Sequence, residues 1–206
     1  MTIDAIVVGP IQVNCYIVAC EDTREAVVID PGDDASRILQ RLTSQKLTLG
    51  HILLTHGHFD HFGAAADLKA ATGATLYAHR ADLDLIEDAP AHAALFGLPA
   101  PKPFTIDRFA AEGDEIVWGR LRAMVLETPG HSRGSVSFLV DKDVFVGDVL
   151  FSRSIGRTDL FGGSYEQLLQ SIRDKLLVLE DDVRVHSGHG PPTTIGRERK
   201  FNPFVI

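Results

Sequence analysis

One short stretch, residues 55–61, constrains this chain more than any other part of the sequence. It reads Thr-His-Gly-His-Phe-Asp-His and follows an apolar run that we predict to be a buried strand. If the backbone stays extended, the side chains of His56 and His58 point to the same side and can bind one cation. Asp60 and His61 lie beyond a change of direction, where they can serve a second cation. The stretch therefore predicts a metal site at the end of a strand.

Three residues far along the chain share this position at the end of a predicted strand. They are His131, Asp148 and His189, and each directly follows a glycine. Glycine leaves room for the backbone to approach an ion closely. With the first four residues they make seven ligands of the imidazole and carboxylate types that suit zinc, iron or manganese. Four other histidines are expected to be structural or solvated: His51, His79, His92 and His186.

The rest of the pattern predicts two runs of strands, each closed by helices, and so two similar layers packed face to face. Strands are expected at 3–8, 13–19, 26–29, 52–54, 75–78, 115–118, 122–127, 135–140, 144–147 and 184–186. Helices are expected at 35–45, 63–71, 81–87 and 165–179. The proline-rich segment 89–103 is interpreted as a loop with a helical turn, which either borders a substrate cleft or is a plain surface connection.

Composition limits the class of protein. With 206 residues, of which 45% are hydrophobic, we expect a single domain, 1–206, with one substantial core. The net charge of -8 argues against a nucleic-acid surface, which needs a basic patch. The N-terminus is acidic where a signal peptide needs basic residues, and no apolar run spans a membrane, so we expect a cytoplasmic protein without a membrane partner. Cys15 and Cys20 are expected to be buried free thiols on opposite sides of a strand.

The spacing His-x-His-x-Asp-His, followed by a distant His, Asp and His, resembles the metallo-β-lactamase-fold hydrolases. The resemblance implies an α/β fold, an αβ/βα sandwich of two mixed sheets flanked by helices, with the metals at one edge. It also implies the role of each ligand. The first metal is then held by His56, His58 and His131, the second by Asp60, His61 and His189, and Asp148 bridges the two.

Two divalent transition metals are the cofactors this resemblance implies, with zinc expected first and iron or manganese as alternatives. Two such ions bring a charge of +4, Asp60 and Asp148 bring -2 and a shared hydroxide brings -1, which leaves +1 to attract an anionic transition state. Paired metals lower the pKa of a shared water to about 7, so hydroxide is available as the nucleophile at neutral pH. Asp60 is the expected catalytic residue, because its carboxylate can orient that hydroxide.

The segments 147–160 and 189–199 resemble the short glyoxalase II-like proteins, which are similar to hydroxyacylglutathione hydrolase. That enzyme cleaves S-lactoylglutathione to lactate and glutathione, so the resemblance implies a small-molecule thioester substrate, with a glutathione derivative as one candidate. Full-length glyoxalase II places Lys-x-Tyr, for glutathione contact, where this chain has Arg157-Thr158-Asp159. Arg157 is expected either to bind an anionic end of the substrate or to pair with Asp159.

Two other readings of the same ligand set remain open. Persulfide dioxygenases share the fold and a Gly-Arg-Thr-Asp stretch like residues 156–159, but oxidise glutathione persulfide at a single iron. Their iron ligands correspond here to His56, His131 and Asp148. The third reading is a non-catalytic β-lactamase-like module, in which an intact set of seven ligands would have no use.

Overall fold

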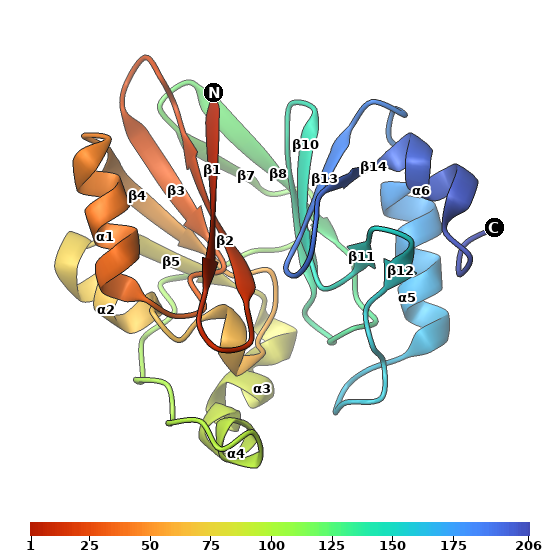
Figure 1. Ribbon diagram of the computed structural model, residues 1–206, viewed down its shortest axis with the longest axis horizontal. Helices are drawn as coiled ribbons and strands as arrows, with labels where there is room; N and C mark the ends of the chain where they lie inside the picture. The colour runs from red at the N-terminus through yellow and green to blue at the C-terminus, as the bar shows by residue number, and fades with distance from the viewer.

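Two six-stranded sheets form the centre of the molecule, and the computed structural model describes all residues from 1 to 206 (Figure 1). In the first sheet the strands follow one another in chain order. The first three strands are antiparallel and the others run parallel to the third. The strands are β1 (Thr2–Val8), β2 (Val13–Ala19), β3 (Glu25–Ile29), β4 (Thr48–Leu53), β5 (Thr75–Ala78) and β6 (Arg108–Phe109).

The second sheet has the order β14-β13-β10-β9-β8-β7, and within it only β10 and β13 pair in parallel. Both sheets are therefore mixed, as the sequence predicts. The strands are β7 (Glu115–Trp118), β8 (Leu121–Glu127), β9 (Val136–Val140), β10 (Asp143–Gly147), β13 (Arg184–Ser187) and β14 (Thr193–Thr194). A small separate hairpin consists of β11 (Leu150–Phe151) and β12 (Ser154–Ile155).

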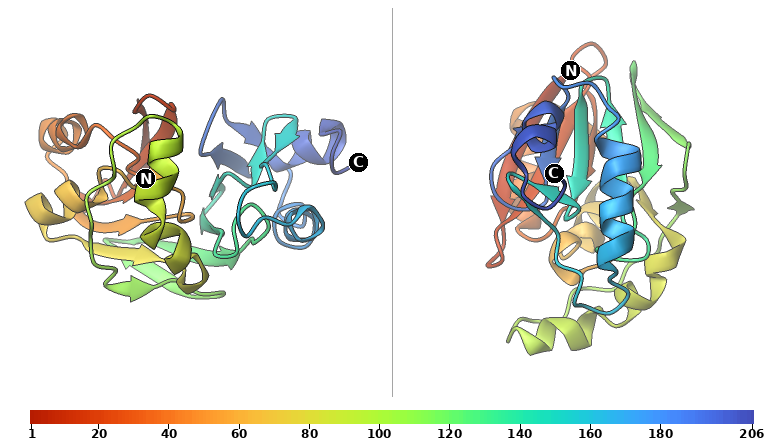
Figure 2. Two further views of the ribbon diagram at one scale, coloured as in Figure 1. Left: turned by 90° about the horizontal axis from the view of Figure 1, so that it is seen from below. Right: turned by 90° about the vertical axis from the view of Figure 1, so that its right-hand side faces the viewer.

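Helices cover the outer faces of both sheets (Figures 1 and 2). The first sheet is covered by α1 (Ala35–Ser44) and α2 (Ala65–Thr72), and the second by α5 (Tyr165–Ser171) and α6 (Ile195–Phe201). Two short helices, α3 (Leu83–Glu87) and α4 (Ala89–Leu95), lie beyond the lower edge of the first sheet in Figure 1. The predicted αβ/βα sandwich is confirmed.

The buried strands read as continuous apolar runs because both of their faces are covered. In β2 the side chains of Cys15 and Ile17 pack in the cluster beneath α1 and α2, whereas Tyr16 packs in the cluster between the sheets. In β10, Phe145 faces the other sheet and Val144 faces α5. This alternation follows from the period of two along a strand. It produces three apolar clusters that bind four layers together and fix the sheet edge where the predicted ligands lie.

The main differences from the predicted elements lie near the edges of the fold. Segment 89–103 contains a helix, α4, whose proline lies in the first turn, where a missing N–H does no harm. The helix expected over 165–179 instead changes to a π-helical segment at Ile172–Leu176. Helix α6 was not predicted; it begins at a cap in which Thr194 Oγ1 accepts a hydrogen bond from the N–H of Arg197 at 3.3 Å.

Both cysteines are buried and unpaired, as expected, and they belong to different apolar clusters. None of the helices combines the length and the apolar character that crossing a membrane requires.

Candidate metal centre

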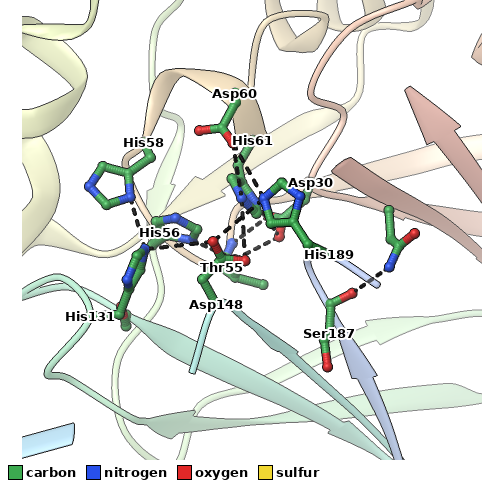
Figure 3. Close-up of polar contacts among 12 residues, drawn as sticks. Asp30, Thr55, His56, His58, Asp60, His61, His131, Asp148, Ser187 and His189 are labelled. Carbon is green, nitrogen blue, oxygen red and sulfur yellow. Dashed lines mark hydrogen bonds and ion pairs between the residues drawn. The ribbon is translucent and has the colours of Figure 1, made fainter. Parts of the chain in front are cut away.

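All the predicted ligands lie at one edge of the sandwich, in loops that follow strands. Parallel neighbours end at the same edge of a sheet, and β4 pairs parallel to β3 while β10 pairs parallel to β13. The loops after β4, β8, β10 and β13 therefore meet below the strands, and Figure 3 shows their side chains converging. The structure brings together all seven: His56, His58, Asp60, His61, His131, Asp148 and His189.

Three buried imidazoles make the first group: His56, His58 and His131, whose candidate ligand atoms all lie within 4.8 Å of one another. His58 Nδ1 is 2.9 Å from His131 Nε2, and the ring of His56 packs edge-on against both of their rings. Burial, reinforced by the neighbouring imidazoles, holds the pKa of His56 well below its usual value and lowers that of His58 to about 3. Both rings are therefore neutral and keep a lone pair for a cation.

The second group combines one carboxylate with two imidazoles, in Asp60, His61 and His189. Asp60 Oδ2 lies 3.7 Å from His61 Nε2 and 3.5 Å from His189 Nε2. Although burial favours the neutral acid, the two facing imidazoles lower the pKa of Asp60. The group therefore presents a charged carboxylate and two ring nitrogens to one point.

The carboxylate of Asp148 faces members of both groups. Its Oδ1 lies 3.6 Å from His61 Nε2, and its Oδ2 lies 3.5 Å from His189 Nε2 and 3.8 Å from His131 Nε2. Burial opposes its charge, but His61 and the other facing imidazoles hold the pKa of Asp148 well below the usual value. Asp148 is therefore a charged group shared between the two sets of ligands.

These residues fit a pair of divalent cations. The Nε2 atoms of His56 and His61 and Oδ1 of Asp148 are buried without any hydrogen-bond partner, an arrangement that is unfavourable unless another group satisfies them. Burial works against a charge on His61, yet Asp148, Asp60 and Asp30 together raise its pKa, so the local potential favours positive charge. Imidazole and carboxylate donors in two adjacent groups are suited to a dinuclear site for divalent metals.

A buried carboxylate that the sequence reasoning did not assign, Asp30, supports this centre. Its Oδ2 is 3.0 Å from His61 Nδ1, and the residue accepts hydrogen bonds from the N–H and hydroxyl of Thr55 at 2.8 and 2.6 Å. A carboxylate on the far ring nitrogen fixes the orientation of a ligating histidine. In the sequence, Asp30 could have been found by its position directly after β3, since β3 is the neighbour of β4, the strand that leads to residues 55–61.

A second unpredicted carboxylate, Asp82, joins two ligand loops. It is buried and accepts hydrogen bonds from the N–H of Gly57 at 2.8 Å, the N–H of Gly134 at 2.6 Å and the hydroxyl of Ser132 at 2.7 Å. Gly57 separates His56 from His58, and Ser132 follows His131. Asp82 thus fixes the distance between the two loops that supply the first group.

We expect Asp82→Asn to weaken metal binding by between about tenfold and a hundredfold, because an amide cannot accept all three hydrogen bonds. Competition with a chromogenic chelator measures the affinity. Asp84→Asn is the matched control, since Asp84 lies two residues further on and is exposed. An Asp82→Asn variant with unchanged affinity would show that the loops keep their spacing without this carboxylate.

Arg157 uses its main chain and its side chain for different purposes. Its carbonyl oxygen is 2.8 Å from His131 Nδ1 and so orients that imidazole. Its guanidinium donates two hydrogen bonds of 2.7 Å to the carboxylate of Asp159. Of the two expectations for this side chain, the pairing with Asp159 is the one present in the structure.

A cavity of about 360 Å³ opens onto the cluster, and Asp60, Asp148 and His189 are among its lining residues. The segment 89–103 borders this cavity through Leu95 and Phe96. His92 also lines it, whereas the other three unassigned histidines have structural partners. These are the Val117 carbonyl for His51, Glu127 for His79 and Asp143 for His186.

Comparison with known families gives one match over most of the chain. Residues 8–189 match the model described as the Metallo-beta-lactamase superfamily. Among curated proteins, the Hydroxyacylglutathione hydrolase GloC of Haemophilus influenzae is similar, with 43% identity over 100% of this chain and 98% of that protein.

Two solved structures resemble the fold along its whole length. The B3 metallo-beta-lactamase BLEG-1 superposes with a TM-score of 0.93, with 42% identity over 99% of each chain. The protein TTHA1623, solved in a di-iron-bound form, gives a TM-score of 0.90 and 42% identity over 98% of this chain and 99% of that one.

Proposed function

The chain belongs to the metallo-beta-lactamase superfamily, and within it we propose a metallohydrolase that cleaves a small-molecule thioester such as S-lactoylglutathione. In this reaction water attacks the carbonyl carbon and the C–S bond breaks, which gives a carboxylic acid and a thiol. The observation that carries the proposal is the position of Asp148, charged and shared between two ligand groups at the wall of an open cavity.

Each ligand has a proposed place. His56, His58 and His131 would hold the first divalent cation, and Asp60, His61 and His189 would hold the second. Asp148 would be a ligand shared by both cations. Bound in this way, a pair of divalent metals supplies a hydroxide at neutral pH and an electrophile for the substrate carbonyl. We propose zinc, with iron or manganese as alternatives, and the di-iron form of the similar protein TTHA1623 supports iron as the first of these.

Asp60 is the proposed catalytic residue of the chain itself. Its Oδ2 faces His61 and His189, and the residue lines the cavity. Because its pKa is lowered, Asp60 is a carboxylate at neutral pH and can accept a hydrogen bond from the attacking water. Orientation of that water toward the cavity is the role that this geometry supports.

Metal analysis combined with a thioester assay tests the proposal. We expect the purified protein to hold about two transition-metal ions per chain and to hydrolyse S-lactoylglutathione. The loss of the thioester absorbance measures the hydrolysis. One iron per chain, with oxygen uptake on glutathione persulfide and no thioester turnover, would instead establish a dioxygenase. A β-lactam is included as a second substrate because the similar protein BLEG-1 is described as a B3 metallo-beta-lactamase.

A further inference from the structure

The mouth of the metal cavity carries an apolar rim, which we define as Leu95, Phe96, Leu160 and Phe161. Leu95 and Phe96 stand at the end of α4, and the other two belong to the loop after β12, which approaches the same edge of the sandwich (Figures 1 and 2). Three of these side chains are more than half exposed: Leu95 at 83%, Phe96 at 58% and Phe161 at 55%. Large apolar side chains that gather around a cavity indicate a ligand-binding surface.

Neighbouring contacts hold the aromatic side chains of the rim. The ring of Phe96 packs on the ring of Phe59, with centroids 5.5 Å apart, and the guanidinium of Arg133 lies 5.0 Å from the centroid of Phe161. The two rings thus line the cavity from different elements, Phe96 from the end of α4 and Phe161 from the loop after β12.

The arginine that lines the cavity is already paired with an acid. Arg157 is the only arginine or lysine on the cavity, and both of its hydrogen bonds go to Asp159. Beside Arg157, the pKa of the Asp159 carboxyl falls to about 2, so the pair stays ionised at every pH of interest. Lys102, in the adjoining cavity of about 310 Å³, is bonded to Asp67.

The basic residues of α6 do not reach the mouth either. Arg199 donates to Asp181 and to the carbonyls of Leu177 and Leu179, on the outer side of the second sheet. A glutathionyl group carries two carboxylates. Arg157, the guanidinium that lines the cavity, is already bonded to Asp159, and the guanidinium of Arg133 lies over the ring of Phe161. An apolar group, in contrast, finds matching side chains on both sides.

We propose that the rim binds an uncharged, apolar group on the thiol side of the thioester, and that Asp159 determines specificity by withholding Arg157 from anionic substrates. This inference rests on the proposed thioester hydrolysis and names the class of substrate for it. S-Lactoylglutathione is then cleaved with a high KM, and a lactoyl thioester of an uncharged thiol that carries a phenyl group is the better substrate.

Three lactoyl thioesters with one acyl group test this inference: those of glutathione, benzyl mercaptan and N-acetylcysteamine. In the unaltered protein we expect KM for the benzyl thioester to be about tenfold lower than for S-lactoylglutathione, a ratio typical of one matched apolar contact. Phe161→Ala should raise KM for the benzyl thioester by about tenfold and change kcat little, since the ring contacts the substrate away from the reacting bond.

Asp159→Asn should have the opposite selectivity, because it removes the charge that occupies Arg157 and keeps the shape of the side chain. KM for S-lactoylglutathione is expected to fall by about tenfold while KM for the benzyl thioester stays unchanged. The matched control is Asp182→Asn, which breaks an exposed ion pair with Lys142 far from the cavity and should alter neither constant. Two results would overturn the inference: an Asp159→Asn variant with the same selectivity as the unaltered protein, or an unaltered protein that prefers S-lactoylglutathione.

Binding measurements separate this inference from the proposed reaction. Calorimetry with N-acetyl-S-benzylcysteamine, a thioether that cannot be hydrolysed, is expected to show binding that Phe161→Ala weakens. If no thioester is cleaved but this pattern holds, the proposed function fails and the rim assignment stands. If thioesters are cleaved and the thioether does not bind, the rim assignment fails and the proposed function stands.

Discussion

Asp148→Ala is expected to lose both metal ions and to lower kcat/KM by about three orders of magnitude. The carboxylate faces His61 and His189 in one group and His131 in the other, so its removal leaves both cations without their shared charge. Metal ions contribute several kcal/mol to transition-state stabilisation, and each 1.4 kcal/mol corresponds to a factor of about ten in rate. Elemental analysis after dialysis and the thioester assay measure the two effects.

The matched variant is Asp148→Asn, which keeps the shape of the side chain and removes its charge. We expect it to retain more metal than Asp148→Ala and to remain well below full occupancy. Circular dichroism establishes that both variants fold. Full metal content in a folded Asp148→Ala protein would show that this carboxylate is not shared between two cations.

Gly188→Ala is expected to reduce the metal content to about one ion per chain and the rate by about a hundredfold. A methyl group at this position would collide with Oδ1 of Asp148 and lie 2.6 Å from Cε1 of His61. Both neighbours are proposed ligands of the second cation. A displacement of about 1 Å at a reacting centre can reduce the rate a hundredfold. Gly188 has no positive φ, so the effect arises from the collision alone.

Gly190→Ala provides the control two residues further on. This glycine has a φ of 74°, but a methyl group there would meet no atom within 4 Å. The control variant should therefore lose about 1 kcal/mol of stability from backbone strain and keep both metals. Equal metal loss in the two variants would mean that strain in the loop, and not contact with Asp148 and His61, controls occupancy.

The sequence predicted the layered fold and located the candidate ligands because both depend on signals that are local in the chain. The strands are short apolar runs, and His and Asp residues directly after such runs are conspicuous. The structure brings those residues to one edge, as predicted, while their binding of metal stays a prediction. Asp30 and Asp82 were not assigned because their partners lie 25 or more residues away. Asp30 was marked only by its position directly after a strand, and Asp82, a single aspartate beside a short helix, by no pattern at all.

Prediction was weakest where competing local signals were balanced. Four prolines in 89–103 indicated a loop, but Pro90 lies in the first turn of α4, and the helix continues to Leu95. For Arg157 the sequence left two roles open, because an arginine two residues before an aspartate can pair with it or face a ligand. Only the three-dimensional structure shows its bond to Asp159 and the role of its carbonyl.

That carbonyl has a consequence for how the loop of residues 157–161 can change. The bond from His131 Nδ1 goes to the main chain of residue 157, and a main-chain oxygen is present whatever the side chain is. The side chains of residues 157–161 can therefore be exchanged to suit a new substrate without releasing the imidazole. Under the proposed assignments, a change of substrate preference in this loop leaves the hydrogen bond that orients His131 in place.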